Sequence, residues 1–164
     1  MRIRWLWFLP VVAWSGVIVA FSSQDATVSA GASAVYAEWI VSAVRWATDW
    51  PAWAPTAPGY ADLLYAVHAA FREAMHVVEY AVLGGLLALG LRRGGPPAWT
   101  ADARALRRTL LWAFVGCLLF ALSDEIHQLG SPGRDFQLLD LSLDAIGSAA
   151  GLAWVGAARR KGTA

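Results

Sequence analysis

Residues 124–151 read DEIHQLGSPGRDFQLLDLSLDAIGSAAG, a stretch in which carboxylates, a histidine and an arginine interrupt an otherwise strongly apolar sequence. The whole chain has 164 residues, of which 58% are hydrophobic and ten are Trp. An ordinary soluble domain is less apolar than this. The composition therefore indicates an integral membrane protein, where charge in the apolar segments is costly and usually has a role.

Four segments approach the roughly 17 to 25 apolar residues that a helix needs to cross a bilayer core. They are residues 5–21, 74–91, 106–122 and 136–156. The first can also be read as a secretory signal peptide, because its start is basic and small residues follow it. Its long apolar run, its Trp residues and the further spans favour an uncut helix. We therefore predict an all-α integral membrane four-helix bundle, with residues 1–164 as a single domain.

The basic residues are distributed unevenly with respect to these spans. Ten of the thirteen Lys and Arg residues fall on one side of a four-span topology, and eleven of the twelve acidic residues fall on the other. The ten are Arg2, Arg4, Arg92, Arg93, Arg104, Arg107, Arg108, Arg159, Arg160 and Lys161. Because cytoplasmic flanks carry the excess of Lys and Arg, we expect both termini in the cytoplasm. No basic face on a soluble fold supports nucleic-acid binding.

An external segment, residues 22–73, separates the first two spans and is too long for a simple turn. Apolar residues recur in it at helical spacing: Val35, Trp39, Ala43, Trp46 and Trp50. We expect an external amphipathic helix that lies in the outer membrane interface, where Trp is favoured. Two interpretations stay open, since this helix either caps the bundle or takes part in the access of a lipid substrate.

Helical projection at about 100° per residue gathers polar side chains on one face of the second span. Arg72, His76 and Glu79 fall within an arc of about 60°. In the fourth span, Asp140 and Asp144 share such a face with two glycines, Gly147 and Gly151. This small-xxx-small pattern allows a neighbouring helix to approach closely, so we expect both aspartates inside the bundle.

A third polar group lies at the outer end of the third span and comprises Asp124, Glu125, His127 and Gln128. Under the deduced topology all three polar groups lie at external helix ends and can meet. A buried Asp costs about 2.5 to 3.5 kcal/mol on insertion scales. Arg72 and Arg134 are the external arginines near the cluster, and two guanidiniums cannot neutralise five acids. A bound cation, protonation or a hydrated cavity must balance the rest.

These residues, in this order relative to four spans, resemble the VanZ-like family of bacterial membrane proteins, which is associated with teicoplanin resistance. The matching positions are Ser22, Ser23, Gln24, Arg72, His76, Glu79, Tyr80, Leu83, Asp124, Glu125, Gln128, Pro132, Gly133, Arg134, Asp140, Asp144, Gly147 and Gly151. The resemblance implies a multi-pass protein of the bacterial cytoplasmic membrane linked to glycopeptide resistance or cell-envelope physiology. Glu73 stands where the family typically has a Lys, which weakens a phosphate site built on a basic pair.

Two functional hypotheses and a structural alternative follow from this cluster. In the first, a metal-assisted hydrolase or transferase acts on a lipid-linked substrate at the outer leaflet. Its candidate catalytic residues are Asp124, Glu125, Asp144 and His76; its candidate substrate-binding residues are Arg72, Arg134, Gln128 and Tyr80; its candidate metal ligands are Glu79, His127, Asp140 and Asp144. The cofactor stays open, with a divalent cation as the candidate.

In the second hypothesis the same residues bind without catalysis. The ligand is then a membrane lipid, a lipid-linked or cell-wall precursor, or a glycopeptide. In the structural alternative the charged cluster only locks the helix bundle, through pairing of Arg72 and Arg134 with the acids, or binds a protein partner. The sequence does not predict the oligomeric state.

Overall fold

The computed structural model describes residues 4–48, 54–96 and 101–158, and all regular elements among them are helices. A short 3-10 helix, η1 (Trp5–Phe8), leads into α1 (Leu9–Ser22), and α2 (Ala26–Thr48), α3 (Tyr60–Gly94), α4 (Ala103–Gln128) and α5 (Leu138–Ala158) follow. The expected all-α class is confirmed. The residues of the sequence analysis that lie outside the described ranges are Arg2, Trp50, Arg159, Arg160 and Lys161.

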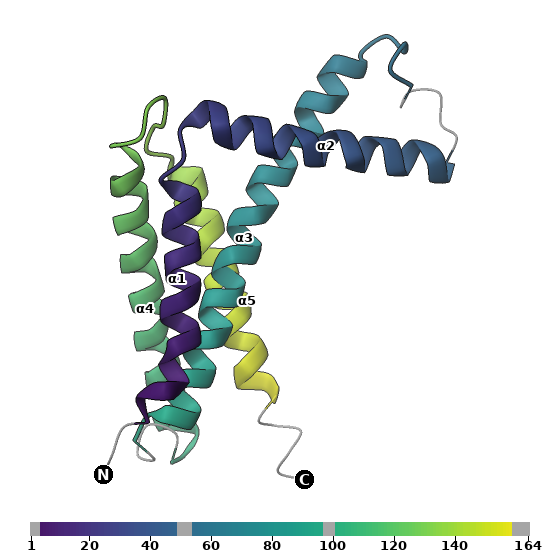
Figure 1. The fold of residues 1–164 in the computed structure, drawn as a ribbon. Helices are drawn as coiled ribbons and strands as arrows, with labels where there is room; N and C mark the ends of the chain where they lie inside the picture. The colour runs from purple at the N-terminus through teal and green to yellow at the C-terminus, as the bar shows by residue number, and fades with distance from the viewer. Residues whose placement is uncertain (1–3, 49–53, 97–100, 159–164) are drawn as a thin grey trace.

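Four helices of the described chain are long and apolar enough to cross a membrane. They are Trp5–Ser22, Tyr60–Gly94, Ala103–Gln128 and Leu138–Ala157, which contain most of the expected spans. α1, α3, α4 and α5 run alongside one another, and α2 crosses the bundle at one end (Figure 1). α3 has 35 residues, or about 52 Å at about 1.5 Å per residue. It therefore exceeds a bilayer core of about 30 Å, and its first turns extend towards α2.

α3 and α5 meet along glycines, as the small-xxx-small pattern predicts. A Cβ atom at Gly147 would overlap the carbonyl oxygen of Val77, and one at Gly151 would overlap that of Ala81. On the facing helix, a Cβ at Gly84 would lie 2.6 Å from the carbonyl oxygen of Ser148. The absence of side chains at these positions allows the two backbones to touch. We call this contact the α3–α5 seam.

α2 packs on α3 through one face and exposes another. Ser33, Ala37 and Val41 are buried, whereas Trp39 and Trp46 on the other face are 69% and 90% exposed. The helix expected in the external segment is therefore confirmed, and Trp39 and Trp46 of its expected apolar face are exposed rather than packed on α3. The contact with α3 includes stacking of Tyr36 on Phe71, with ring centroids 5.3 Å apart, and a 2.7 Å contact of Ser33 Oγ with His68 Nε2.

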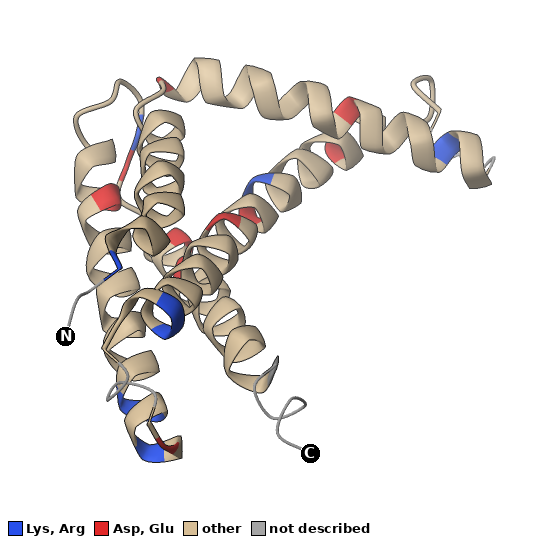
Figure 2. Cartoon of the chain, turned by 60° about the horizontal axis from the view of Figure 1, so that its bottom comes forward, with Lys and Arg blue, Asp and Glu red and all other residues tan. Residues whose placement is uncertain are grey.

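At the opposite end of the bundle, arginines gather where α3 ends and α4 begins (Figure 2). The backbone N–H of Arg4 donates to the carbonyl of Gly94 at 2.9 Å. Arg92 Nη1 donates to the carbonyl of Val155 at 2.9 Å, and the Arg93 guanidinium lies 4.9 Å from the centroid of the Trp7 ring. These contacts join the start of η1 to the ends of α3 and α5. The described basic residues therefore follow the expected separation of charge.

Candidate functional site

A cavity of about 450 Å³ lies at the α2 end of the bundle. Residues of α1, α2, α3 and α4 and of the turn before α5 surround it. Its apolar lining includes Ile18, Phe21, Tyr36, Phe71 and Met75. The ionisable and amide side chains in its lining are Arg72, His76, Glu79, Tyr80, Asp124, Gln128 and Arg134, together with Gln24. We call this space the outer cavity.

The outer cavity brings together seven of the residues that the sequence analysis selected, and it leaves out four. The four are Glu125, His127, Asp140 and Asp144. His127 lies on the exposed side of α4, where its Nε2 is 3.0 Å from Ser23 Oγ. Glu125, Asp140 and Asp144 are buried between helices. The predicted cluster is therefore divided between a cavity lining and a helix interface.

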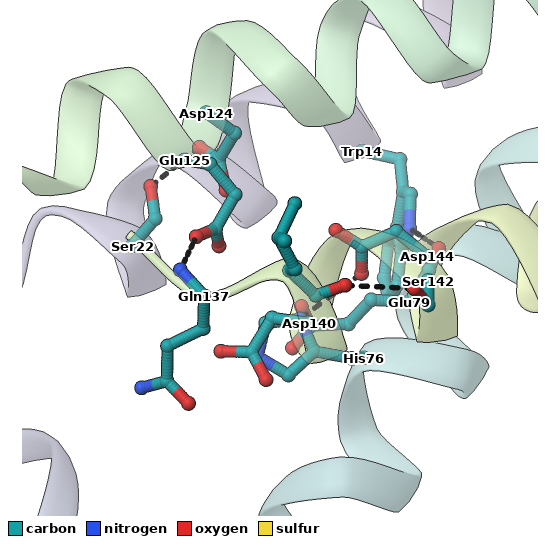
Figure 3. A network of polar contacts seen from close by, with 11 residues as sticks. Trp14, Ser22, His76, Glu79, Asp124, Glu125, Gln137, Asp140, Ser142 and Asp144 are labelled. Carbon is teal, nitrogen blue, oxygen red and sulfur yellow. Dashed lines mark hydrogen bonds and ion pairs between the residues drawn. The ribbon is translucent and has the colours of Figure 1, made fainter. Parts of the chain in front are cut away.

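His76 links α3 to both aspartates of α5. Its Nδ1 atom lies 3.0 Å from Asp144 Oδ1, and its Nε2 atom lies 3.4 Å from Asp140 Oδ2 (Figure 3). Asp144 is 1% exposed and Asp140 is 6% exposed. An imidazolium ring can donate to both carboxylates at once, whereas a neutral ring can donate to one. This triad belongs to the α3–α5 seam, one turn beyond Gly147.

The two acids at the end of α4 also make specific contacts. Ser22 Oγ donates to Asp124 Oδ1 at 2.6 Å, which fastens the end of α1 to α4 (Figure 3). The backbone N–H of Gln137 donates to Glu125 Oε2 at 3.0 Å just before α5 begins. Glu125 therefore satisfies one of the backbone N–H groups that are left without a partner at a helix start. Both carboxylates position helices.

The two arginines of the outer cavity behave differently from the acids. Within residues 4–48, 54–96 and 101–158, neither Arg72 nor Arg134 forms an ion pair, in contrast to His76. Burial, followed by the positive charge of Arg72, lowers the pKa of Arg134. The Nε of Arg134 makes a long hydrogen bond, 3.4 Å, to the carbonyl of Gln24. The two guanidinium groups thus interact with one another, and the carboxylates that attract Arg134, those of Asp140, Glu125 and Asp124, do not form an ion pair with it in the described structure.

The turn that carries Arg134 is held by the backbone. The N–H of Ala26 donates to the carbonyl of Pro132 at 3.1 Å, and Gly133 follows with a φ of 73°, which favours glycine. These features connect the start of α2 to the α4–α5 turn. They bring Arg134 to the same cavity as Arg72 of α3.

Tyr80 is the largest side chain of the described residues that is less than 2% exposed. Its ring packs on Phe120, with centroids 6.2 Å apart. Its hydroxyl has no hydrogen-bond partner among the described residues, although the side chain lines the outer cavity. A buried hydroxyl without a partner costs about 1 to 3 kcal/mol, so a bound ligand is a natural source of the missing hydrogen bond.

The expected metal ligands do not come together in one place. In the part of the chain that the structure describes, no group of three or more His, Cys, Asp and Glu side chains has an arrangement that could hold a metal ion. His127 is directed to Ser23, while both ring nitrogens of His76 face aspartates.

The structure adds contacts that sequence reasoning did not identify. Trp14 Nε1 donates to the backbone carbonyl of Glu79 at 2.8 Å, and this bond joins α1 to α3 beside the cavity (Figure 3). A Trp within an apolar span gives no sign of such a partner 65 residues away. Gln137 was missed for a similar reason, since its backbone rather than its side chain makes the contact with Glu125.

Comparison with known protein families identifies the relationship of the chain. The family model described as VanZ/LLP1 matches residues 7–158, which include all five α-helices of the described chain and the whole of the outer cavity. No curated protein and no solved structure matches the chain. With four helices able to span a membrane and a family match over nearly its full length, this multi-pass membrane protein belongs to the VanZ/LLP1 family.

Proposed function

We propose that the protein binds the anionic head group of a membrane lipid, or of a lipid-linked cell-wall precursor, in the outer cavity. The observation that carries this proposal is the pair of cavity-lining guanidiniums, Arg72 and Arg134, which form no ion pair within the described residues. Guanidinium groups match phosphate and carboxylate oxygens in geometry and charge. Binding an anion would relieve the repulsion between them.

Recognition without catalysis is the activity that the contacts favour. Each of the carboxylates considered as a catalytic group already has a structural partner: Asp124 accepts from Ser22, Glu125 from Gln137, and Asp144 faces His76. A general base needs access to the proton that it removes. Asp144 and Glu125 do not line the cavity. We therefore assign the arginines to binding and the acids mainly to the framework.

The proposal includes a location and a physiological role. The excess of arginine at the end of the bundle opposite to the outer cavity supports a cytoplasmic position for both termini, and hence an outer-leaflet position for the cavity. Family membership supports a link to glycopeptide resistance. We propose that head-group binding at the outer face of a bacterial cytoplasmic membrane contributes to teicoplanin resistance.

Lipid binding to the purified protein tests the first part. Short-chain phosphatidylglycerol and a polyprenyl phosphate serve as probes, and native mass spectrometry in detergent measures occupancy. Arg72→Gln and Arg134→Gln should each weaken binding about tenfold, because each removes one charge-assisted hydrogen bond to the head group. Arg45→Gln is the matched control, because Arg45 is exposed on α2 and outside the cavity lining. Equal binding by wild type and by the double variant of Arg72 and Arg134 would refute the proposal.

Teicoplanin susceptibility tests the second part. A deletion strain is complemented with wild type, Arg72→Gln, Arg134→Gln or Arg45→Gln, and membrane levels are matched by immunoblotting. We expect wild type and Arg45→Gln to restore resistance and the two cavity variants to fail. A deletion strain as resistant as its parent would exclude the role in resistance while leaving head-group binding unaffected.

A further inference from the structure

The outer cavity contains charges of both signs that do not neutralise one another directly. Arg72 and Arg134 contribute the positive charges, while Glu79 and Asp124 contribute negative ones. No Arg–carboxylate pair within 4.0 Å joins these groups in the described chain. Opposite charges that line the same cavity but remain apart are complementary to a ligand that carries both signs.

The two signs are ordered along α3. Arg72 and Glu79 are seven residues apart, so they lie on nearly the same helix face, separated by about 10 Å along the axis. Arg72 is nearer to the start of α3, where α2 crosses, and Glu79 is two turns further into the bundle. The cavity therefore offers positive charge at its α2 side and negative charge deeper inside.

The carboxylate of Glu79 is available to a ligand. Trp14 holds the backbone carbonyl of Glu79, but no hydrogen bond or ion pair of its side chain occurs among the described residues. His76, one turn before Glu79 on α3, interacts with it electrostatically, but both ring nitrogens of His76 face the aspartates of α5. Desolvated carboxylates without a partner are costly in a membrane bundle, and a ligand cation would remove this cost.

The neighbouring residue gives an independent indication of a ligand. Tyr80 is 1% exposed, and its hydroxyl is one of the buried polar atoms without a partner in the described structure. It lines the cavity next to Glu79 in sequence. The apolar lining formed by Phe21, Tyr36 and Phe71 suits the start of an acyl chain. The cavity volume of about 450 Å³ is large enough for a lipid head group.

We propose that the outer cavity selects a phosphoethanolamine group, with its phosphate at Arg72 and Arg134 and its primary ammonium at Glu79. This inference rests on the proposed function and extends it, because it names the second half of the ligand. The ammonium donates hydrogen bonds to Glu79, whereas the phosphate accepts from the guanidiniums. A trimethylated ammonium cannot donate, and a glycerol head group has no positive charge.

A comparison of four probes tests the selection. These are short-chain phosphatidylethanolamine, phosphatidylcholine and phosphatidylglycerol, and free O-phosphoethanolamine. For the wild type we expect about tenfold tighter binding of phosphatidylethanolamine than of the other two lipids, because only its ammonium can donate a charged hydrogen bond to Glu79. If free O-phosphoethanolamine binds as tightly as the lipid, recognition of the phosphate and the ammonium would be supported, and the ligand would be a soluble phosphoethanolamine rather than a lipid. Equal affinity for the three lipids would overturn the inference and leave the proposed function standing.

The variant Glu79→Gln tests the residue. It should abolish the preference for phosphatidylethanolamine while binding phosphatidylglycerol as well as wild type or better. Glu73→Gln is the control, because Glu73 is exposed on the same helix and does not line the cavity. A preference that survives Glu79→Gln in protein with an unchanged melting temperature would overturn the assignment to Glu79. If that variant does not fold, the three-lipid comparison on wild type still decides the selection. Loss of phosphatidylglycerol binding in Arg72→Gln tests the proposed function separately.

Discussion

The α3–α5 seam and the outer cavity draw on the same short list of polar residues and use them in opposite ways. At the seam, each ring nitrogen of His76 lies within 3.4 Å of an aspartate carboxylate of α5. Glycines bring the backbones of α3 and α5 into contact. In the cavity, two arginines, one glutamate and one tyrosine hydroxyl have no ion pair or side-chain hydrogen-bond partner among the described residues, apart from the long bond from Arg134 to Gln24. The seam pairs its charged side chains with one another, whereas the cavity contains charged side chains whose contacts a ligand can complete.

This contrast gives each hypothesis from the sequence its own test. We propose that the charged cluster that locks the bundle is the seam, with His76 rather than either arginine in the central position. We propose that the binding pocket is the outer cavity. If the division is correct, substitutions at the seam should affect stability, and substitutions in the cavity should affect binding.

The largest effect on stability is expected at Gly151. Its Cβ would overlap the carbonyl oxygen of Ala81 and lie 2.7 Å from the backbone nitrogen of Gly85, so Gly151→Ala forces the two helices apart. We expect a loss of more than about 3 kcal/mol in the free energy of unfolding, beyond the usual cost of overpacking. Unfolding in mixed micelles with SDS, followed by Trp fluorescence, measures it.

Gly116→Ala is the control for this change. A Cβ at Gly116 meets no atom within 4 Å. Because Ala favours the helix more than Gly does, the substitution should stabilise α4 by up to about 1 kcal/mol. Comparable stability of the two variants would show that α3 and α5 do not depend on backbone contact at Gly151.

A smaller loss is expected at Asp144. Asp144→Asn keeps the shape of the side chain but removes the charge that faces His76 Nδ1 at 3.0 Å. Breaking a buried pair costs about 3 to 5 kcal/mol, and the retained amide oxygen should reduce this to about 2 to 3 kcal/mol. Asp135→Asn, at an exposed position, is the control. A double-mutant cycle with His76→Gln should give a coupling energy of about 0.5 to 3 kcal/mol, and a coupling of zero would contradict the lock.

The part of this framework that could be predicted from sequence is the part set by local spacing. Offsets of three and four residues place Asp140, Asp144, Gly147 and Gly151 on one face, and that face does meet α3. α3 begins at Tyr60, before the predicted span of residues 74–91, because its less apolar first turns continue the same helix beyond the apolar run.

Contacts between distant parts of the chain could not be predicted in this way. Ser22 and Asp124 are 102 residues apart, and nothing in either local sequence indicates the other. The charges of Arg72 and Arg134 likewise indicated only that either could pair with the acids. Which charges pair depends on packing distances of a few ångströms, and these follow from the arrangement of all the helices.

Ser22 tests a cavity side chain that already has a structural partner, since Asp124 of α4 lines the cavity and accepts a hydrogen bond from α1. Ser22→Ala removes the 2.6 Å hydrogen bond to Asp124 Oδ1 and leaves a buried carboxylate oxygen without it. Hydrogen bonds to charged groups contribute about 1.5 to 3 kcal/mol, so we expect a loss of about 1.5 kcal/mol. Ser142→Ala removes an exposed bond to the carbonyl of Leu138 and should cost much less. Equal losses would mean that Asp124 is held by other groups.

The smallest effect on stability, less than about 0.5 kcal/mol, is expected for Arg72→Gln. Arg72 lines the cavity without an ion pair in the described structure, and its charge lowers the pKa of the nearby Arg134, so removing the charge relieves repulsion. The same unfolding assay measures the variant beside Asp144→Asn. If Arg72→Gln destabilised the protein as much as Asp144→Asn does, Arg72 would be part of the framework rather than a cation available to a ligand. An unchanged stability together with weakened lipid binding is the combination that a structural role cannot produce, because a side chain that only supports the fold cannot be removed without a cost to the fold.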